Sequence, residues 1–250
     1  MLAVIGGSGL AGLGQMNVVR REVARTPFGD PSGLLIFGEM NDAPVLFLAR
    51  HGPGHILAPH RVNYRANVWA LRQAGATHIL AVAAVGGIAA NAGPGVIAAP
   101  DQIIDYTYGR EHTFCDGSDR SVVHIDFTQP YSDELRNSVI AAAASAREPM
   151  VASGVYGATQ GPRLETAAEI TRMARDGATL VGMTGMPEAA LARELSLHYA
   201  HLCVVSNWAA GCGNSVSEIS HDAIDSTLDN SIGRVQNIIA ALVGSFRAGS

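Results

Sequence analysis

The chain has 250 residues, 48% of them hydrophobic and 16% charged, and this composition excludes a disordered or fibrous protein. The formal net charge of −5 argues against a broad basic surface, so we expect no nucleic-acid partner. No run of about 18 apolar residues occurs, so no membrane partner is expected either. The N-terminus does not resemble a secretion signal, and Cys115, Cys203 and Cys212 have no CxxC spacing, which favours a reducing cytoplasm.

Short apolar runs alternate with amphipathic stretches along the chain. We expect strands in LAVIGGSG, PVLFLARHG, HILAVAAVGGI, TLVGMTGM and HLCVVSNWAAG. Helical periodicity covers Asn63–Gly75, Ser132–Ala146, Thr166–Asp176, Pro187–Leu197 and Ser220–Phe246. This alternation predicts an α/β fold, a single domain over residues 1–250 with a mostly parallel, twisted central sheet flanked by helices. The polar, aperiodic segment Asp105–Gln129 is expected to be a long excursion that serves a function or an interface.

The apolar runs end in glycines or polar residues, and ligands of such sheets bind beyond the carboxyl ends of the strands. Gly6-Gly7-Ser8-Gly9 follows the first run, where backbone N–H groups and the Ser8 hydroxyl could donate to an anion. A tight turn explains the same glycines. The segment lacks the GxGxxG spacing and the Walker lysine, so it does not predict dinucleotide or ATP binding.

Arg50-His51-Gly52 follows the second run, with His55 and His60 close behind. An arginine at the end of a strand suits bidentate contact with phosphate, although a surface ion pair is an equally ordinary role. No cysteine or carboxylate completes a metal-ligand spacing around the histidines, so we expect no metal.

Thr184 precedes a predicted helix, where free N–H groups favour an anion, or where its hydroxyl simply caps the helix. Glu165 in GPRLE and Asn207 at the end of the last strand could be an ordinary helix acid and an ordinary turn residue. We expect the combination, rather than any one of these residues, to mark a site.

Together these residues resemble the trimeric purine nucleoside and methylthioadenosine phosphorylases. The resemblance covers nearly the whole chain, most strongly in IGGSGL, LARHGPGHILAPHRVNYRANVWALRQAGATHIL, AVGGI, IDYTYGREHTF, TQGPRLETAAEI and MTGMPEAALARE. It implies a nucleoside phosphorylase-like fold and a homotrimer.

The resemblance also assigns the residues of the expected site. It implies a phosphate site from Ser8, Arg50, His51 and Thr184, closed by the backbone near Ala84. It adds Met183 against the ribose, Leu164 among the nucleoside contacts, and His124 donated by a neighbouring subunit to the 5′ end of the sugar. Ala83 departs from the family, which often has a hydroxyl or amide there, so one phosphate or ribose contact is missing or supplied by water.

The family mechanism needs no cofactor, and inorganic phosphate is a co-substrate. The C–N bond lengthens first, giving a ribosyl cation like that of glycoside hydrolysis. Phosphate then attacks the sugar and stabilises its charge. Hydrogen bonds to the purine help it to leave.

Specificity within the family depends on the groups that face the base and the 5′ end. Glu165 can accept the N1–H of a 6-oxopurine, and Asn207 can donate to O6 and accept from N7, which favours hypoxanthine and guanine over adenine. The resemblance places His221 beside the 5′ group, where an imidazole suits a hydroxyl. We therefore expect phosphorolysis of inosine and guanosine, with Asn207 and His221 as catalytic residues. His221 as an exposed helix-start residue remains the alternative role.

Three other functions remain open from the sequence. Methylthioinosine or methylthioadenosine phosphorolysis is the first, because MTGMPEAALARE and HIDFTQPY are most similar to bacterial methylthioinosine phosphorylases. The second is a nucleoside hydrolase, which usually needs a carboxylate-rich calcium site that this sequence does not suggest. The third is a silent nucleoside-binding protein, for which the phosphate residues would have no use.

Overall fold

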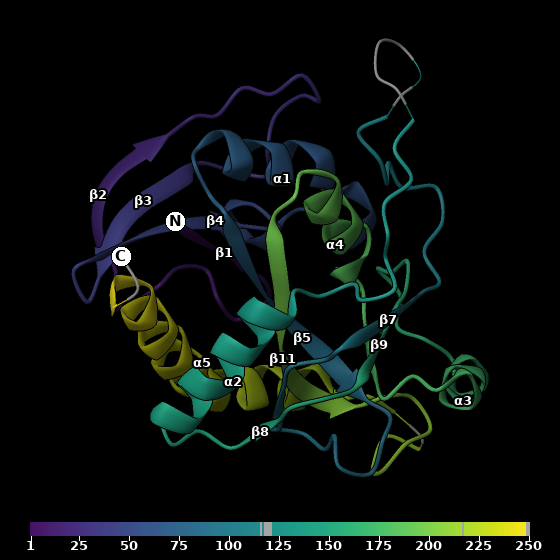
Figure 1. Cartoon of the computed structure of the whole chain (residues 1–250). Helices are drawn as coiled ribbons and strands as arrows, with labels where there is room; N and C mark the ends of the chain where they lie inside the picture. The colour runs from purple at the N-terminus through teal and green to yellow at the C-terminus, as the bar shows by residue number, and fades with distance from the viewer. Residues whose placement is uncertain (116, 118–121, 217, 249–250) are drawn as a thin grey trace.

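The computed structural model describes residues 1–250 except 116, 118–121, 217 and 249–250 (Figure 1). The strands are β1 Leu2–Gly6, β2 Asn17–Glu22, β3 Leu35–Met40, β4 Ala43–Ala49, β5 His78–Gly87, β6 Ile97–Ala98, β7 Gln102–Asp105, β8 Met150–Val151, β9 Val155–Ala158, β10 Leu180–Gly182 and β11 His198–Trp208. The helices are α1 Tyr64–Gln73, α2 Asp133–Ser145, α3 Ala167–Asp176, α4 Gly185–Glu194 and α5 His221–Ala248, with short 3₁₀ turns η1 Pro53–His55 and η2 Pro59–Arg61.

All of these strands join one mixed sheet, in the order β2-β3-β4-β1-β5-β10-β9-β7. Strand β11 pairs in parallel along the whole of β5 and connects to β6 and then β8. The other edge of β5 is therefore shared by β1, parallel to its first half, and β10, antiparallel to its last residues. The centre of the sheet is largely parallel, as the alternating pattern predicts, and the antiparallel pairs lie mainly around it.

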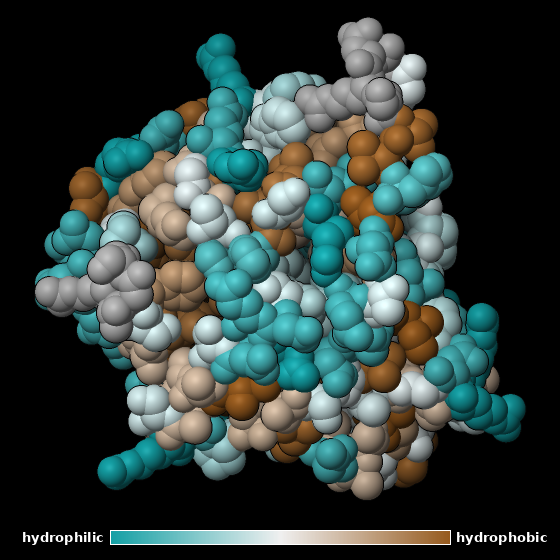
Figure 2. Space-filling view, in the orientation of Figure 1, coloured by the Kyte–Doolittle hydropathy of each residue, from teal (hydrophilic) through white to brown (hydrophobic). Residues whose placement is uncertain are grey.

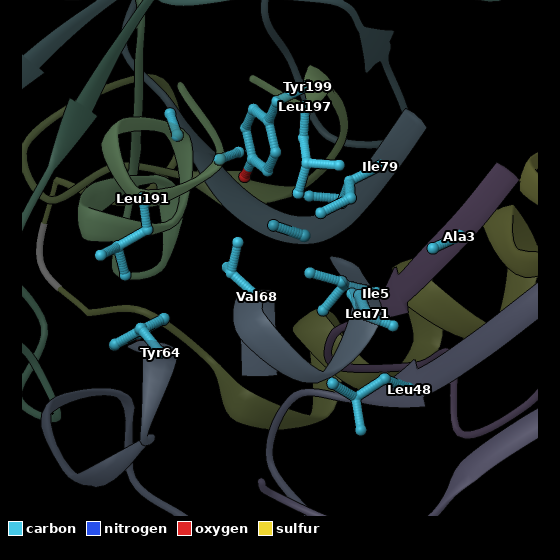
Figure 3. Close-up of a cluster of buried hydrophobic side chains, with 14 of the residues drawn as sticks. Ala3, Ile5, Leu48, Tyr64, Val68, Leu71, Ile79, Leu191, Leu197 and Tyr199 are labelled. Atoms are coloured by element: carbon cyan, nitrogen blue, oxygen red, sulfur yellow. The ribbon is translucent and has the colours of Figure 1, made fainter. Parts of the chain in front are cut away.

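Helices cover both faces of the sheet, with α1 and α4 on one side and α2 and α5 on the other (Figure 1). Successive residues of β1 divide between two hydrophobic clusters, because side chains alternate across a strand. Ile5 packs with Val68 and Leu71 of α1 in the cluster drawn in Figure 3. Val4 packs in the second cluster, with α2 and α5. This burial on both faces explains why the central strands are continuous apolar runs.

Helices α1, α2, α3 and α5 begin within one residue of the predicted positions, because polar side chains cap their free N–H groups. Helix α4 instead begins at Gly185, two residues before the prediction, without a side-chain cap. Asn63 accepts from Ala66 N at 3.1 Å, and Ser132 accepts from Leu135 N at 3.3 Å. Thr166 and Glu169 form a reciprocal capping box at α3. None of the helices in the described residues is long and apolar enough to cross a bilayer.

Strands β2, β3, β6, β7, β8 and β9 are not predicted from the sequence. Every residue of β2 is exposed, so β2 has no buried alternation, and β6 and β8 are two residues long. The expected excursion begins at the end of β7. From residue 106 to residue 132 its described residues form no helix or strand, and it projects from the body of the molecule (Figure 1).

Candidate active site

A cavity of about 330 Å³ opens where the central strands end. It brings together every residue that the sequence assigns to the site except His124, from segments as far apart in the chain as Ser8 and His221. Its lining includes Ser8, Arg50, His51, Ala83, Ala84, Leu164, Glu165, Met183, Thr184, Asn207 and His221. The ends of β1, β4, β5, β10 and β11 supply most of them, as expected for an α/β sheet.

Arg50 is fully buried at the inner wall and is bound by a carboxylate that the sequence analysis did not assign to the site. Its Nε and Nη2 donate to the two oxygens of Glu188 at 2.6 and 2.9 Å, and Nη1 donates to Val82 O at 2.8 Å. Tyr199 donates its hydroxyl to the same carboxylate at 2.9 Å. Burial alone lowers the pKa of Arg50, but Glu188 outweighs it and the net pKa is raised.

The edge of the Arg50 guanidinium that carries Nε and Nη2 is therefore paired with Glu188 inside the protein. Because this edge faces Glu188, the expected bidentate contact with an anion stays a prediction for Nη1 and Nη2. A guanidinium has five N–H donors, so one N–H on each terminal nitrogen remains. Any anion in the cavity can contact Arg50 through these two N–H groups alone.

The glycine loop packs directly on Arg50. A Cβ on Gly7 would lie 2.8 Å from Arg50 Nη1 and 2.5 Å from Val82 O, so the close approach requires glycine. Gly9 has φ +80°, which also favours glycine. The half-buried Ser8 follows on this loop, and its hydroxyl lies 3.4 Å from His55 Nε2. The turn that the glycines predict therefore forms part of the cavity lining.

His51 is held as a neutral imidazole. Its Nδ1 lies 2.7 Å from Leu57 O, and because a carbonyl only accepts, Nδ1 carries the hydrogen. Burial, followed by the charge of Arg50, lowers the pKa of His51 to about 4. Nε2 is then an unprotonated acceptor at neutral pH. The ring lies against that of His55, with centroids 4.3 Å apart and planes tilted by 36°. The pKa of His55 is also lowered, first by burial and then by Arg50.

Thr184 does not cap α4 with its side chain. Its hydroxyl is buried and has no hydrogen-bond partner among the described residues, while its backbone N–H donates to Tyr156 Oη at 3.2 Å. A buried hydroxyl without a partner costs about 1–3 kcal/mol. Because Thr184 lines the cavity, a bound anion would supply that partner.

Glu165 and Asn207 lie together in the lining, held by short hydrogen bonds. Thr159 donates to Glu165 Oε1 at 2.6 Å. Asn207 accepts from Ser206 Oγ at 2.8 Å and donates to Trp208 O at 2.7 Å. The pairing of β11 with β5 shifts by one residue between Val205 and Asn207, so Ser206 is the extra residue of a bulge. Each side chain keeps polar capacity for a ligand.

Met183, Leu164 and His221 complete the lining, and Met183 Sδ closes on Gly161, where an added Cβ would lie 2.4 Å away. His221 is exposed at the first residue of α5, where Ser220 accepts from Ala223 N at 3.3 Å. His221 therefore lines the cavity and also begins a helix, so its position fits both of the roles considered in the sequence analysis. Its neighbours in the lining are the apolar Ile219 and Ile224.

His124 lies outside the cavity, exposed on the excursion. From the same excursion comes a residue that sequence reasoning missed. Arg110 is buried and donates to the carbonyls of Met183, Met186, Thr159 and Gln160 at 2.6 to 3.1 Å. It ties together the two loops that carry Glu165 and Thr184. The one sequence signal was its position inside the motif IDYTYGREHTF.

A sequence model described as the phosphorylase superfamily matches residues 1–244. The chain belongs to the phosphorylase superfamily. A probable S-methyl-5′-thioinosine phosphorylase of Xanthomonas campestris is 54% identical to it over 241 residues, covering 96% of each chain. The 6-oxopurine nucleoside phosphorylase of Pyrococcus furiosus is 40% identical, covering 97% of this chain and 91% of its own.

Solved structures agree with this membership. Methylthioadenosine phosphorylase from Schistosoma mansoni, in complex with adenine, superposes with a TM-score of 0.94 at 32% identity, covering 99% of this chain and 92% of its own. The predicted α/β fold and family resemblance are therefore confirmed. The protein is an enzyme, a nucleoside phosphorylase and hence a pentosyltransferase of purine salvage, with phosphate as co-substrate.

Proposed function

We propose that the enzyme cleaves S-methyl-5′-thioinosine with phosphate, giving hypoxanthine and 5-methylthioribose 1-phosphate. The sequence alone favours inosine or guanosine through His221. The relatives favour the methylthio substrate, since the 54% identical protein is named for it and the 6-oxopurine nucleoside phosphorylase is 40% identical. Inosine is the second candidate, supported by the cavity position of His221.

The observation that carries the proposal is the lining around His221. Ile219 and Ile224 line the cavity beside it, and a thiomethyl group gains from apolar contact while making almost no hydrogen bonds. His221 is exposed, so its imidazole keeps water as a partner when no hydroxyl is present. The penalty for binding a thiomethyl group next to it is therefore small.

The 6-oxo base is supported by Glu165 and Asn207. Thr159 occupies Glu165 Oε1, which leaves Oε2 to accept the N1–H that hypoxanthine has and adenine lacks. The remaining N–H of Asn207 suits O6. Adenine has an acceptor at N1 and an amino donor at C6, so it would place an acceptor against Glu165 and a donor against the N–H of Asn207. A buried polar group left unpaired in this way costs about 1–3 kcal/mol.

For phosphate, we propose the free N–H groups of Arg50, the hydroxyls of Ser8 and Thr184, and the backbone near Ala84. Neutral His51 accepts a hydrogen bond from a protonated phosphate oxygen through Nε2. As the C–N bond lengthens, the sugar becomes cationic and phosphate stabilises it before attacking the anomeric carbon. The purine leaves with the electron pair of the C–N bond and takes a proton from water at N7, where Asn207 Oδ1 accepts the new N–H, and Met183 packs against the ribose.

Initial rates on methylthioinosine, inosine, guanosine, methylthioadenosine and adenosine, each with and without phosphate, test the proposal. We expect base release to require phosphate, methylthioinosine to have the highest kcat/KM, and both adenine nucleosides to be at least tenfold slower, about 1.4 kcal/mol. A higher kcat/KM for inosine would instead select the second candidate. Equal rates on methylthioadenosine and methylthioinosine would refute the base assignment.

The variant His221→Met separates the two sugar readings. If methylthioinosine is the substrate and His221 is only a helix-start residue, cleavage of both nucleosides stays unchanged in the variant. A collapse of inosine cleavage alone would show that His221 reads a 5′-hydroxyl. Ser220→Ala is the matched control, because it removes the helix cap without changing the cavity lining.

A further inference from the structure

Two histidines and a glutamate meet at the N-terminal ends of the central strands β5 and β11, whereas the cavity lies at their carboxyl ends. His78 begins β5 and His198 begins β11, and the two are paired in the parallel register. Glu134 lies in the first turn of α2. One ligand atom from each residue lies within 4.8 Å of the others, and a carboxylate oxygen of Glu134 is 3.6 Å from His78 Nε2.

Each imidazole already has a partner for its Nδ1, as metal-bound histidines usually do. His78 Nδ1 lies 2.8 Å from Thr77 Oγ1, and His198 Nδ1 lies 2.8 Å from Ser132 Oγ. When these nitrogens donate to the hydroxyls, Nε2 of each ring keeps a lone pair. For His198 it is Nδ1 that lies 3.8 Å from Glu134 Oε2, so this ring has to turn to present Nε2 to an ion. The Thr77 and Ser132 hydroxyls can therefore hold both rings in the tautomer with hydrogen on Nδ1, which is the tautomer that binds a metal through Nε2.

We propose that His78, His198 and Glu134 form a structural site for Zn²⁺ or a similar imidazole-binding divalent ion. Two imidazoles and a carboxylate with water in a fourth position is a familiar zinc ligand set. Imidazole nitrogen selects zinc, copper or nickel over magnesium and calcium, which prefer oxygen ligands. The ion would connect β5, β11 and α2, and take no part in the reaction.

Loading the site requires a small rearrangement. The two rings are stacked, with centroids 4.5 Å apart and planes 11° apart, so their in-plane lone pairs run side by side. Zinc needs both nitrogens at about 2.0–2.1 Å, so one ring must turn. The His198 side chain is 42% exposed and Glu134 68%, which leaves room for both to move, while His78 at 15% stays fixed.

Calorimetric titration of the chelator-treated full-length enzyme with ZnCl₂ in phosphate-free buffer tests the site. We expect one tight ion per chain, no comparable binding of Mg²⁺, and a Tm rise of about 5 °C at a hundredfold excess over Kd. His78→Gln and His198→Gln should each weaken zinc binding at least tenfold, and Glu134→Gln less. Phosphorolysis measured without zinc should be unchanged in all three.

His112→Gln is the matched control, since His112 is another exposed histidine, away from the proposed ligands. Unchanged zinc affinity in both His78→Gln and His198→Gln would overturn the proposal. So would loss of binding in His55→Gln, because the ion would then lie in the cavity beside His51. Absorption of bound Co²⁺ in the visible range reports tetrahedral coordination directly and does not depend on a shift in stability.

Discussion

At the scale of single residues, the site depends on a charge placed in the interior. Arg50 and Glu188 have no exposed side-chain surface, and each would be costly there without the other. The sequence places Arg50 correctly at the end of a strand. It could not reveal Glu188, because Pro187-Glu188 has the composition of any helix start, and only the packing of α4 turns that carboxylate inward.

Glu188→Gln should weaken phosphate binding more than nucleoside binding. The amide cannot accept both Arg50 donors, so the guanidinium loses its fixed plane and its neutralising charge. We expect the KM for phosphate to rise at least tenfold, the KM for nucleoside to change little, and the free energy of unfolding to fall by about 3–5 kcal/mol. Steady-state kinetics and urea unfolding measure these effects.

Tyr199→Phe is the graded control, because it removes one hydrogen bond to Glu188 and leaves the charge pair intact. Its effect on the KM for phosphate should be several times smaller. Equal effects of Glu188→Gln on both KM values would contradict a positioning role and indicate general loss of structure.

His51 should make the fold sensitive to mild acid. Its pKa is about 4 in the folded enzyme and 6.5 for the free side chain, so the unfolded chain binds more protons between these values. Stability is therefore full above pH 6.5 and falls as the pH drops toward 4, by up to about 2 kcal/mol at pH 5. Urea unfolding at pH 7 and 5 should show a smaller loss in His51→Gln than in the wild type. An identical loss would mean that His51 titrates normally.

At the scale of elements, strands and helices with continuous burial or strong caps could be predicted, and the links between them could not. The apolar runs of β1, β4, β5 and β11 follow directly from burial on both faces. The tie made by Arg110 depends on four carbonyls from two distant loops, and no local pattern encodes such contacts.

Arg110→Lys should loosen both loops at once. A lysine ammonium cannot reproduce the planar fork that reaches Met183 O, Met186 O and Thr159 O together. We expect faster amide hydrogen exchange in residues 159–165 and 183–187 and a several-fold higher KM for nucleoside. Arg65→Lys, on an arginine whose Nη2 pairs with an exposed glutamate, provides the comparison. Unchanged exchange in both loops would rule out the tie.

At the scale of the whole molecule, we predict a homotrimer in which the excursion reaches a neighbouring cavity. The excursion carries the exposed apolar residue Tyr108 and, directly before His124, the exposed Val122 and Val123. Hydrophobic atoms also lie beside the excursion in Figure 2. Such surfaces commonly mark interfaces. Closed symmetry is the norm for soluble oligomers.

Light scattering after size exclusion should give three times the 26.0 kDa chain mass. His124→Ala should then raise the KM for nucleoside while the trimer persists. Mixing it with the inactive Arg50→Ala variant should restore part of the activity if His124 acts across the interface. A fully active monomer would disprove this arrangement.

The bulge at Ser206 has a consequence for how this enzyme can change over generations. Up to Val205, β11 pairs with β5 in one continuous register, and this register sets which side chains of β11 face each side of the sheet. The extra residue releases Asn207 from the alternation of the core, so its amide does not have to point to the face that the pairing of Val205 would dictate. A one-codon deletion at Ser206 would do the reverse. It would leave Asn207 opposite Gly86 but remove the bulge that sets the direction of its side chain, so we expect a folded variant with altered selectivity for the base.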